Sequence, residues 1–406
     1  MKAFEDELKD RLRSLRDAGR LRRLEMPAGR DFASNDYLGL ARDRAFAARL
    51  EERLGSALDA AEPLAGAPAS RLLRGQTPLH AELETSLAAF KGTEAALLVP
   101  SGYQANVGMI QALAGPGDRI LSDALNHASL IDGMRLSKAE VFVVPHLDVD
   151  GFGRRLAEDW PGRTFLITES LFSMDGDLAP LDRYVELCER HGAELIVDDA
   201  HATGLWGERG SGWVEELGLE RRVLAVTSTF GKAFGAAGAF IAGSKTLIRY
   251  LVNTCRSFIY STAVSPLVCH AAAVGLEVIR GEPERRLRVR ALADRLRAKL
   301  DAAGLPTPPG GGPIVPVILG EESRAVEVSR RLQGAGFDVR AVRPPTVPPG
   351  TSRLRLSVHA DHRPEEIDLL VTLLAAAASG AAGVRPSAPQ SGAPAPYPPT
   401  AEAVAG

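Results

Sequence analysis

Short apolar runs alternate with helically patterned segments across the middle of the chain. Segments such as 181–192, with apolar residues at helical spacing, lie between several of these runs. Strands separated by helices pair wholly or mostly in parallel, and helices then cover both faces of the sheet. The pattern therefore predicts a large α/β domain. Its expected strands are the runs at 95–99, 119–122, 141–144, 165–168, 194–197, 223–226 and 239–243.

The segment after about residue 280 predicts a second, smaller domain of α+β type. A charged helical pattern opens it at 284–300, a second helix is expected at 323–336, and a third begins at Pro364. Strands are expected between these helices, at 313–319, 338–342 and 353–358.

These patterns divide the chain into four parts. Residues 1–45 form an N-terminal helix and segment, 46–280 the large domain, and 281–380 the small C-terminal domain. The Pro/Ala-rich tail at 381–406 is predicted to be disordered, because it cannot bury enough apolar surface to offset its ordering entropy. The first helix is amphipathic, and we expect it to pack on the body or on a partner subunit through Phe4, Leu8, Leu12 and Leu15.

Composition narrows the partners and the compartment. The 406 residues carry a formal net charge of −3, so they offer no broad positive field to nucleic acid or to an anionic membrane. The longest apolar stretch, 369–378, is about half the length of a bilayer span. Three widely spaced cysteines and the lack of an evident targeting pattern favour the cytoplasm. We expect neither a nucleic acid nor a membrane as partner.

Polar groups follow four of the expected strands, at 100–106, 169–177, 198–204 and 229–235. In an open α/β sheet, ligands bind outside the carboxyl ends of the strands. Each segment alone has an ordinary structural explanation as a turn or a capped loop. Together they provide a possible phosphate cup at a helix start, a carboxylate, an imidazole, hydroxyls and a lysine.

This set suits pyridoxal 5′-phosphate (PLP). Lys232 would form a Schiff base with the cofactor, and Asp198 would hold the pyridine nitrogen protonated. The turn from Ser101 to Tyr103 would hold the phosphate.

Other familiar sites do not fit. A P-loop is excluded because Ala233 follows Lys232 and Val226 stands where the first glycine is required. No GxGxxG follows a strand, and no GxSxG is present. Cys188 and His191 lie on a periodic helix and, even with His201, lack a second closely spaced ligand pair, so we expect no metal.

A series of motifs in the chain resembles the α-oxoamine synthases over roughly residues 1 to 378. The resemblance implies PLP-dependent transferase fold type I, like aspartate aminotransferase, and a homodimer with its active site at the interface. It also implies an acyltransferase that condenses an amino acid with an acyl thioester and releases CO2. The motifs are SNDYLGL (34–40), PLHAELE (78–84), SGYQAN (101–106), NHASLIDG (126–133), ESLFSMDGD (169–177), VDDAHATG (197–204), TFGKAFG (229–235) and YST (260–262).

The same resemblance implies a role for individual residues. Those with a catalytic role would be Lys232, His127, Asp198 and His201. Cofactor contacts would be Gly102, Tyr103, His127, Ser173, Asp198, His201, Thr229, Lys232 and, from the neighbouring subunit, Thr262. Substrate contacts would be Arg22, Asn35, His127, Thr346 and Arg355.

The residues also support Arg355 independently. Alternation along 353–356 places Arg353 and Arg355 on one face of the expected strand. An arginine fork there can pair with the carboxylate of an amino acid. A solvated strand face is the alternative.

Within the family, the segment 343–362 is most like members that join L-alanine to a pimeloyl thioester, carried by coenzyme A or acyl carrier protein. Members that use glycine with acetyl or succinyl thioesters remain open. So does a non-catalytic PLP-binding regulatory module, although the presence of Lys232, Asp198 and His201 together argues against it. One departure is AGAPASR (65–71) in place of a Gly-rich segment, which stiffens a loop and could change acyl preference.

Overall fold

The computed structural model describes residues 2–18, 20–22, 24, 26–59 and 64–379. The tail predicted to be disordered lies outside these residues. Over the described part, no helix is both long enough and apolar enough to cross a membrane.

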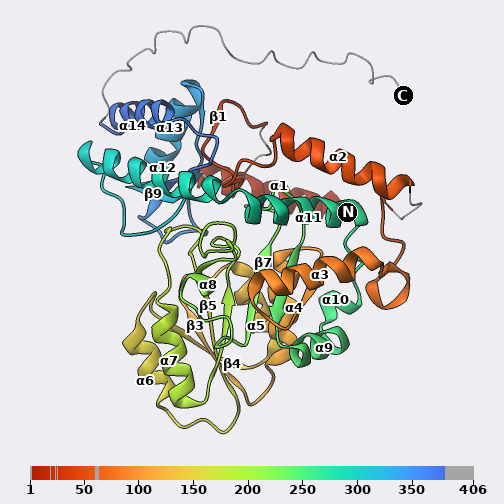
Figure 1. The fold of residues 1–406 in the computed structure, drawn as a ribbon. Coiled ribbons are helices and arrows are strands. Elements are labelled where there is room, and N and C mark those ends of the chain that lie inside the picture. The colour runs from red at the N-terminus through yellow and green to blue at the C-terminus, as the bar shows by residue number, and fades with distance from the viewer. Residues whose placement is uncertain (1, 19, 23, 25, 60–63, 380–406) are drawn as a thin grey trace.

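The large domain is built on a seven-stranded, mostly parallel sheet in the order β2-β8-β7-β6-β5-β3-β4 (Figure 1). Only β8 runs antiparallel to its neighbours, β2 and β7. The predicted α/β class is confirmed. β7 begins two residues later than the expected run at 223–226, and it ends at Thr229. The strands are β2 (Ala95–Val99), β3 (Arg119–Asp123), β4 (Glu140–Val144), β5 (Thr164–Glu169), β6 (Glu194–Asp198), β7 (Ala225–Thr229) and β8 (Ala239–Gly243).

Helices cover both faces of this sheet, as buried parallel strands require. Alternate residues of one strand enter different cores: Leu97 packs with Met109 and Leu130 on one face, whereas Leu98 packs with Leu87 on the other. The helices of this part are α2 (Arg44–Asp59), the π-helix η1 (Arg71–Gly75), α3 (Pro78–Lys91), α4 (Gly102–Leu113), α5 (Ala128–Ser137), α6 (Val149–Leu156), α7 (Leu181–His191), α8 (Trp213–Glu216), α9 (Lys245–Thr254), α10 (Arg256–Ile259) and α11 (Pro266–Gly281).

The C-terminal part has a separate apolar core around the antiparallel sheet β11-β12-β9. The N-terminal segment joins it, because β1 (Arg30–Asp31) pairs in parallel with β10. Figure 1 shows this part beyond one end of the large sheet, reached through α11 and α12. Its elements are α12 (Pro283–Ala302), β9 (Ile314–Gly320), α13 (Glu322–Gly334), β10 (Phe337–Asp338), β11 (Ala341–Val342), β12 (Ser352–Ser357) and α14 (Pro364–Ala378).

The single strand predicted at 338–342 is wrong, because this segment forms two short strands with different partners. β10 pairs with β1, whereas β11 pairs with β12. Between them, the carbonyl of Val339 accepts hydrogen bonds from Ser329 Oγ (2.7 Å) and Gln333 Nε2 (3.1 Å) of α13. Helix side chains therefore use the backbone group that a continuous ladder would need.

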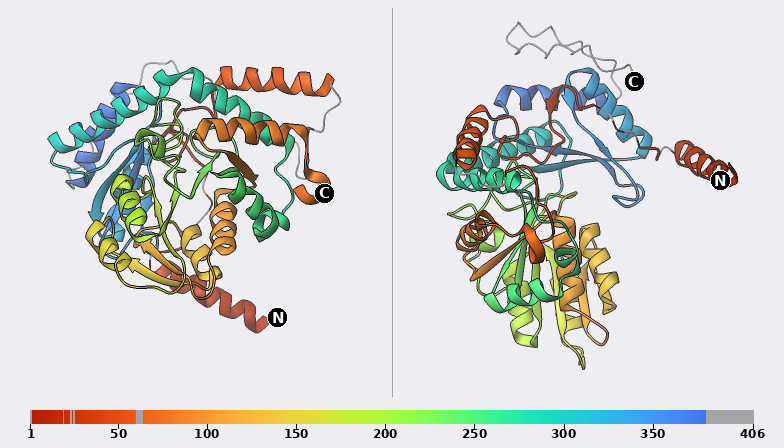
Figure 2. Two further views of the ribbon diagram at one scale, coloured as in Figure 1. Left: turned by 60° about the horizontal axis from the view of Figure 1, so that its bottom comes forward. Right: turned by 90° about the vertical axis from the view of Figure 1, so that its right-hand side faces the viewer.

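The first helix, α1 (Lys2–Asp17), stands away from the rest of the chain in the right-hand view of Figure 2. Its apolar stripe is between 41% and 62% exposed, so it does not pack on the body of this chain as one expectation had it. Packing on a partner subunit stays a prediction. The stripe consists of Phe4, Leu8, Leu12 and Leu15.

Candidate active site

Lys232 lies in the loop that follows β7. The loop is closed by hydrogen bonds from Phe230 N to the carbonyl of Gly238 (2.9 Å) and from Ala236 N to the carbonyl of Phe230 (2.9 Å). Nζ of Lys232 has no hydrogen-bond or ion-pair partner among the described residues. Burial lowers the pKa of Lys232 to about 8, although the carboxylates of Asp198 and Glu169 oppose that shift. The amine is therefore free to react and partly neutral near physiological pH.

Asp198 ends β6 and is held from two sides. Its Oδ2 accepts a hydrogen bond from Asn106 Nδ2 (2.6 Å), and its Oδ1 accepts one from Ala200 N (3.0 Å). Asn106, on α4, also donates to Ser129 Oγ (2.9 Å). These bonds fix the plane of a buried carboxylate, which is what a partner for a protonated ring nitrogen requires. Residue assignment from sequence missed Asn106 and Ser129, although both lie inside the quoted motifs SGYQAN and NHASLIDG.

His127 is the N-cap of α5, and its Nδ1 accepts a hydrogen bond from Ser129 N (3.2 Å). Burial lowers the pKa of His127, the charge of Lys232 acts in the same direction, and Asp198 opposes it. The imidazole is therefore neutral, with its proton on Nε2. Through Ser129 and Asn106, this ring is connected to the carboxylate of Asp198.

His201 is buried, and its Nδ1 lies 2.7 Å from the hydroxyl of Tyr37. Burial holds the pKa of His201 well below its usual value, and the cations Lys232 and Arg355 add to this. Tyr37 was not assigned from sequence, although it lies in SNDYLGL. Its hydroxyl also contacts Asn35 Oδ1 (3.2 Å), which places the predicted substrate residue Asn35 in the same network.

Arg355 is 7% exposed and its neighbour on the strand face, Arg353, is 4% exposed, so the solvated alternative for this face is wrong. All three nitrogens of Arg355 donate within the chain: Nε to the carbonyl of Ser173, Nη1 to Ser357 Oγ (2.8 Å) and Nη2 to Asn35 Oδ1 (2.9 Å). Nη1 retains one further N–H. Pairing with a substrate carboxylate stays a prediction.

Backbone amides and a hydroxyl without partners among the described residues lie where α4 begins. The helix starts at Gly102, because Ser101 caps it by accepting a hydrogen bond from Gln104 N (3.2 Å). The amides of Gly102 and Tyr103 therefore have no helical partner. Thr229 Oγ1 is buried without a hydrogen-bond partner in the described chain, and its Cγ2 would lie 2.4 Å from a Cβ built on Gly102.

These observations fit PLP. The unpartnered amine of Lys232 suits its aldehyde, the fixed carboxylate of Asp198 suits its ring nitrogen, and the helix start with Thr229 suits its phosphate.

Four of the residues predicted to bind cofactor or substrate are exposed and make no hydrogen bond to Lys232 or Asp198 in the described chain. Arg22 Nη2 donates to Thr346 Oγ1 (3.3 Å), and both side chains are exposed. Tyr103 is exposed, with its hydroxyl bonded to Asp132. Thr262 is exposed beside Ser261, whose Oγ accepts from Gln104 Nε2 (3.1 Å) at the start of α4. The roles of these four residues stay predictions.

Glu169 is a further buried residue that sequence reasoning did not assign, although it opens ESLFSMDGD. It pairs in register with Asp198, and its Oε1 has no hydrogen-bond partner among the described residues. Burial, with Asp198 as the next cause, raises the pKa of Glu169 well above its usual value.

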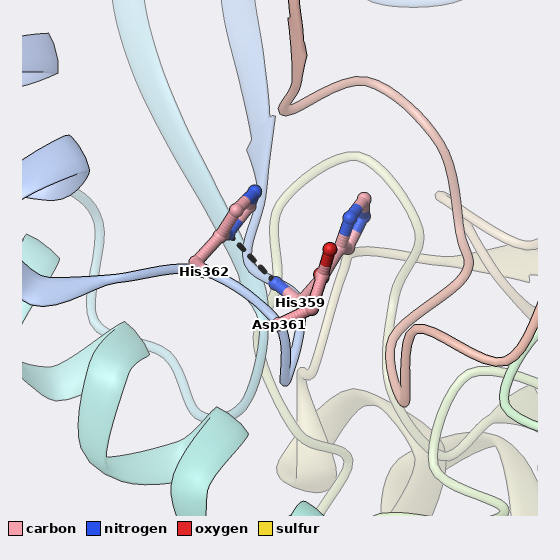
Figure 3. Close-up of side chains that lie close together, drawn as sticks. All are labelled: His359, Asp361 and His362. Carbon is pink, nitrogen blue, oxygen red and sulfur yellow. Dashed lines mark hydrogen bonds between the residues drawn. The ribbon is translucent and has the colours of Figure 1, made fainter. Parts of the chain in front are cut away.

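A metal centre is not the better interpretation of the cluster His359, Asp361 and His362 (Figure 3). Nδ1 of His362 accepts from His359 N (3.0 Å), and its Nε2 lies 2.7 Å from the carbonyl of Asp31. Burial lowers the pKa of His362 to about 3, so the ring is neutral and both of its nitrogens are already used. The ring connects the C-terminal part to the N-terminal segment.

The family model for aminotransferase class I and II matches residues 29–374. The chain belongs to this family. Curated relatives named 8-amino-7-oxononanoate synthase include those of Anaeromyxobacter dehalogenans, 47% identical over 85% of each chain, and Alkalilimnicola ehrlichii, 46% identical over 84% of this chain and 86% of the relative.

Solved structures agree. A serine palmitoyltransferase from S. paucimobilis with PLP bound superposes with a TM-score of 0.83 at 30% identity, over 93% of this chain and 98% of that chain. An 8-amino-7-oxononanoate synthase from Francisella tularensis gives a TM-score of 0.72 at 25% identity, over 86% and 97%. The chain is thus a PLP-dependent α-oxoamine synthase of fold type I, which confirms the resemblance read from its motifs.

Proposed function

We propose that this enzyme condenses L-alanine with a pimeloyl thioester, releasing CO2 and the thiol carrier and forming 8-amino-7-oxononanoate for biotin biosynthesis. The names of relatives that are 43–47% identical over the matched stretch support this choice of substrates. The main support for this chemistry is the amine of Lys232, which has no partner among the described residues and has a lowered pKa. The amine is close enough to Asp198 for the two charges to interact.

When PLP is bound, it supplies an aldehyde for amine capture and a ring that accepts the electron pair released at the α-carbon. Lys232 would bind the aldehyde covalently. Its amine, with a pKa of about 8, would also take the α-proton of alanine, because a base works best when its pKa lies near the working pH.

Asp198 would accept a hydrogen bond from the protonated ring nitrogen, with Asn106 holding the carboxylate in that direction. His127 would lie against the ring and keep its Nε2 proton for a substrate oxygen, because Nδ1 is occupied by Ser129 N. His201, kept neutral by burial, would face the ring hydroxyl with Ser173. Arg355 and Asn35 would bind the carboxylate of alanine.

The active site would be completed by a second copy of the chain, with Thr262 reaching the phosphate across the interface. Large exposed apolar side chains near this segment support such an interface. Ala263 N donates to the carbonyl of Ala69 (3.0 Å), so the segment after Thr262 lies beside the one that precedes η1. The exposed side chains are Leu72, Leu73 and Tyr260.

A substrate panel tests the proposal. The purified enzyme with PLP is given L-alanine, glycine or L-serine, each with pimeloyl, acetyl, succinyl or palmitoyl coenzyme A, and pimeloyl acyl carrier protein is tested with alanine. The expected result is the highest kcat/KM for alanine with a pimeloyl thioester, with products identified by mass spectrometry. A higher kcat/KM for glycine or serine with another thioester would refute the substrate assignment.

A further inference from the structure

His146 lies outside the residues assigned to PLP and occupies an unusual position between two carboxylates. It follows β4, and its Nδ1 is 2.8 Å from Asp123 Oδ1 while its Nε2 is 2.8 Å from Asp177 Oδ2. A neutral imidazole has one N–H, whereas an imidazolium has two. Both contacts are donated at once only by the charged ring.

The surroundings of the ring favour that charge. Asp123 is fully buried at the end of β3 and also accepts from Leu147 N (2.9 Å). The hydroxyl of Tyr184 on α7 interacts electrostatically with both aspartates and with Asp148, and the nearest charge of opposite sign to Asp148 is Arg154, which pairs with it (3.4 Å) and is largely exposed. Although burial alone would lower the pKa of His146, the two aspartates raise it to about 10.

One of these aspartates belongs to a hairpin that reaches the active site. We call residues 171–178 the site hairpin, because Leu171 and Leu178 form an antiparallel bridge and Phe172 N donates to the carbonyl of Asp177 (3.0 Å). The ring of His146 also meets the ring of Phe172 edge-on, with centroids 4.4 Å apart. His146 therefore holds the site hairpin by charge and by packing.

The other side of the site hairpin is held by the small domain. Arg353 donates to Asp175 Oδ1 and to the carbonyl of Met174 (3.3 Å), and Arg355 donates to the carbonyl of Ser173. His146 links the site hairpin to the large domain, because it also contacts Asp123 at the end of β3. Arg353 and Arg355 link the same hairpin to the small domain. The position of Arg355 thus depends on where the site hairpin lies.

We propose that His146 is a positioning residue that, as an imidazolium, fixes the site hairpin and thereby sets the places of Ser173 and Arg355 in the PLP site. This inference rests on the proposed function for its kinetic consequence. It predicts that the amino acid, which Arg355 would bind, loses affinity when the charge at 146 is removed, whereas the chemistry at Lys232 is affected less.

The first experiment compares His146→Gln with His191→Gln, since His191 is an exposed histidine in the last turn of α7. H146Q is expected to raise KM for the amino acid about 10- to 100-fold, as loss of a supporting contact behind a ligand-binding residue does, with kcat changed only a few-fold. H191Q is expected to match the wild type. Equal kinetic constants for all three proteins would overturn the inference.

The second experiment separates charge from shape. Asp177→Asn alone removes an anion that His146 holds. In H146Q the same change removes a partly buried anion that has lost its cation. The double variant H146Q/D177N is therefore expected to bind the amino acid at least as well as H146Q. If the losses of amino acid affinity in the two single variants added up in the double variant, only the shape of the His146 side chain would matter. That result would overturn the inference.

The third readout needs no turnover. In holoenzyme labelled with 15N-histidine, one imidazolium signal is expected to persist at pH 8.5 and to be missing from H146Q. Absence of any such signal in the wild type would overturn the inference. Failure of the wild type to form product from any amino acid would refute the proposed function instead, and this signal would then decide the inference.

Discussion

Asn106 Nδ2 lies 2.6 Å from Asp198 Oδ2, which joins the helix that begins at the phosphate end of the site to the carboxylate at the ring end. The hydrogen bond is buried and its acceptor is a charged carboxylate. Hydrogen bonds to charged groups contribute about 1.5–3 kcal/mol. Asn106→Ala is therefore expected to weaken PLP binding by about 10- to 100-fold.

Titration of the apoenzyme with PLP, followed by absorbance, measures this loss. Gln111→Ala is the control on the same helix, because Gln111 lies near the far end of α4 and makes no side-chain hydrogen bond among the described residues. An unchanged dissociation constant in N106A, with the fold intact by circular dichroism, would remove Asn106 from the site.

Lys232 gives the apoenzyme a pH-dependent reaction with PLP. Only the neutral amine attacks the aldehyde, and the pKa of Lys232 is about 8, so the rate of covalent capture is expected to rise with pH and to level off above that value. Glu169→Gln removes a carboxylate that raises this pKa, so its rate profile is expected to shift to lower pH. Stopped-flow absorbance measures both profiles.

Lys232→Ala is the control for this reaction. It is expected to abolish covalent capture and to lower turnover by about 10²- to 10⁴-fold or more, because the general base is lost with it. If K232A turned over at the wild-type rate, the assignment of Lys232 would be wrong.

Gly102 and Thr229 are in close contact at the phosphate end. A Cβ at Gly102 would lie 2.4 Å from Thr229 Cγ2, so Gly102→Ala must displace the strand end or the helix start. We expect G102A to weaken PLP binding by about tenfold or more, since both elements present phosphate donors.

Thr229→Ser tests the cause, because serine keeps the hydroxyl and lacks Cγ2. The double variant G102A/T229S is expected to recover much of the PLP affinity that G102A loses, while T229S alone stays near the wild type. No recovery in the double variant would mean that another contact of Gly102 limits binding.

His146 makes the stability of the fold depend on pH. Its pKa in the folded state is raised from the usual 6.5 to about 10, so its contribution is fully present below pH 6.5 and is lost as pH rises toward 10. Between these values the free energy of unfolding of the wild type is expected to fall toward that of His146→Gln. Urea unfolding of both proteins at pH 6, 8 and 9.5 measures the difference, and a constant difference would contradict the raised pKa.

Local pattern was enough for most of the secondary structure. The strands at 95–99 and 239–243 begin and end where their apolar runs do, because a strand that is covered by helices on both faces needs a short continuous apolar run. The segment 338–342 could not be predicted in the same way. Its backbone is divided between partners from β1, α13 and β12, which are distant in sequence.

The sequence by itself determined the chemistry of this protein, because Lys232, Asp198 and His201 follow strands whose ends must meet at one edge of a parallel sheet. Tertiary structure alone decided how these groups are held. The contact of Asn106 with Asp198 spans 92 residues, and those of His146 with Asp123 and Asp177 span 23 and 31. Hydrogen-bond partners across such separations are set by how helices and loops pack on the sheet, and no local pattern of residues encodes that packing.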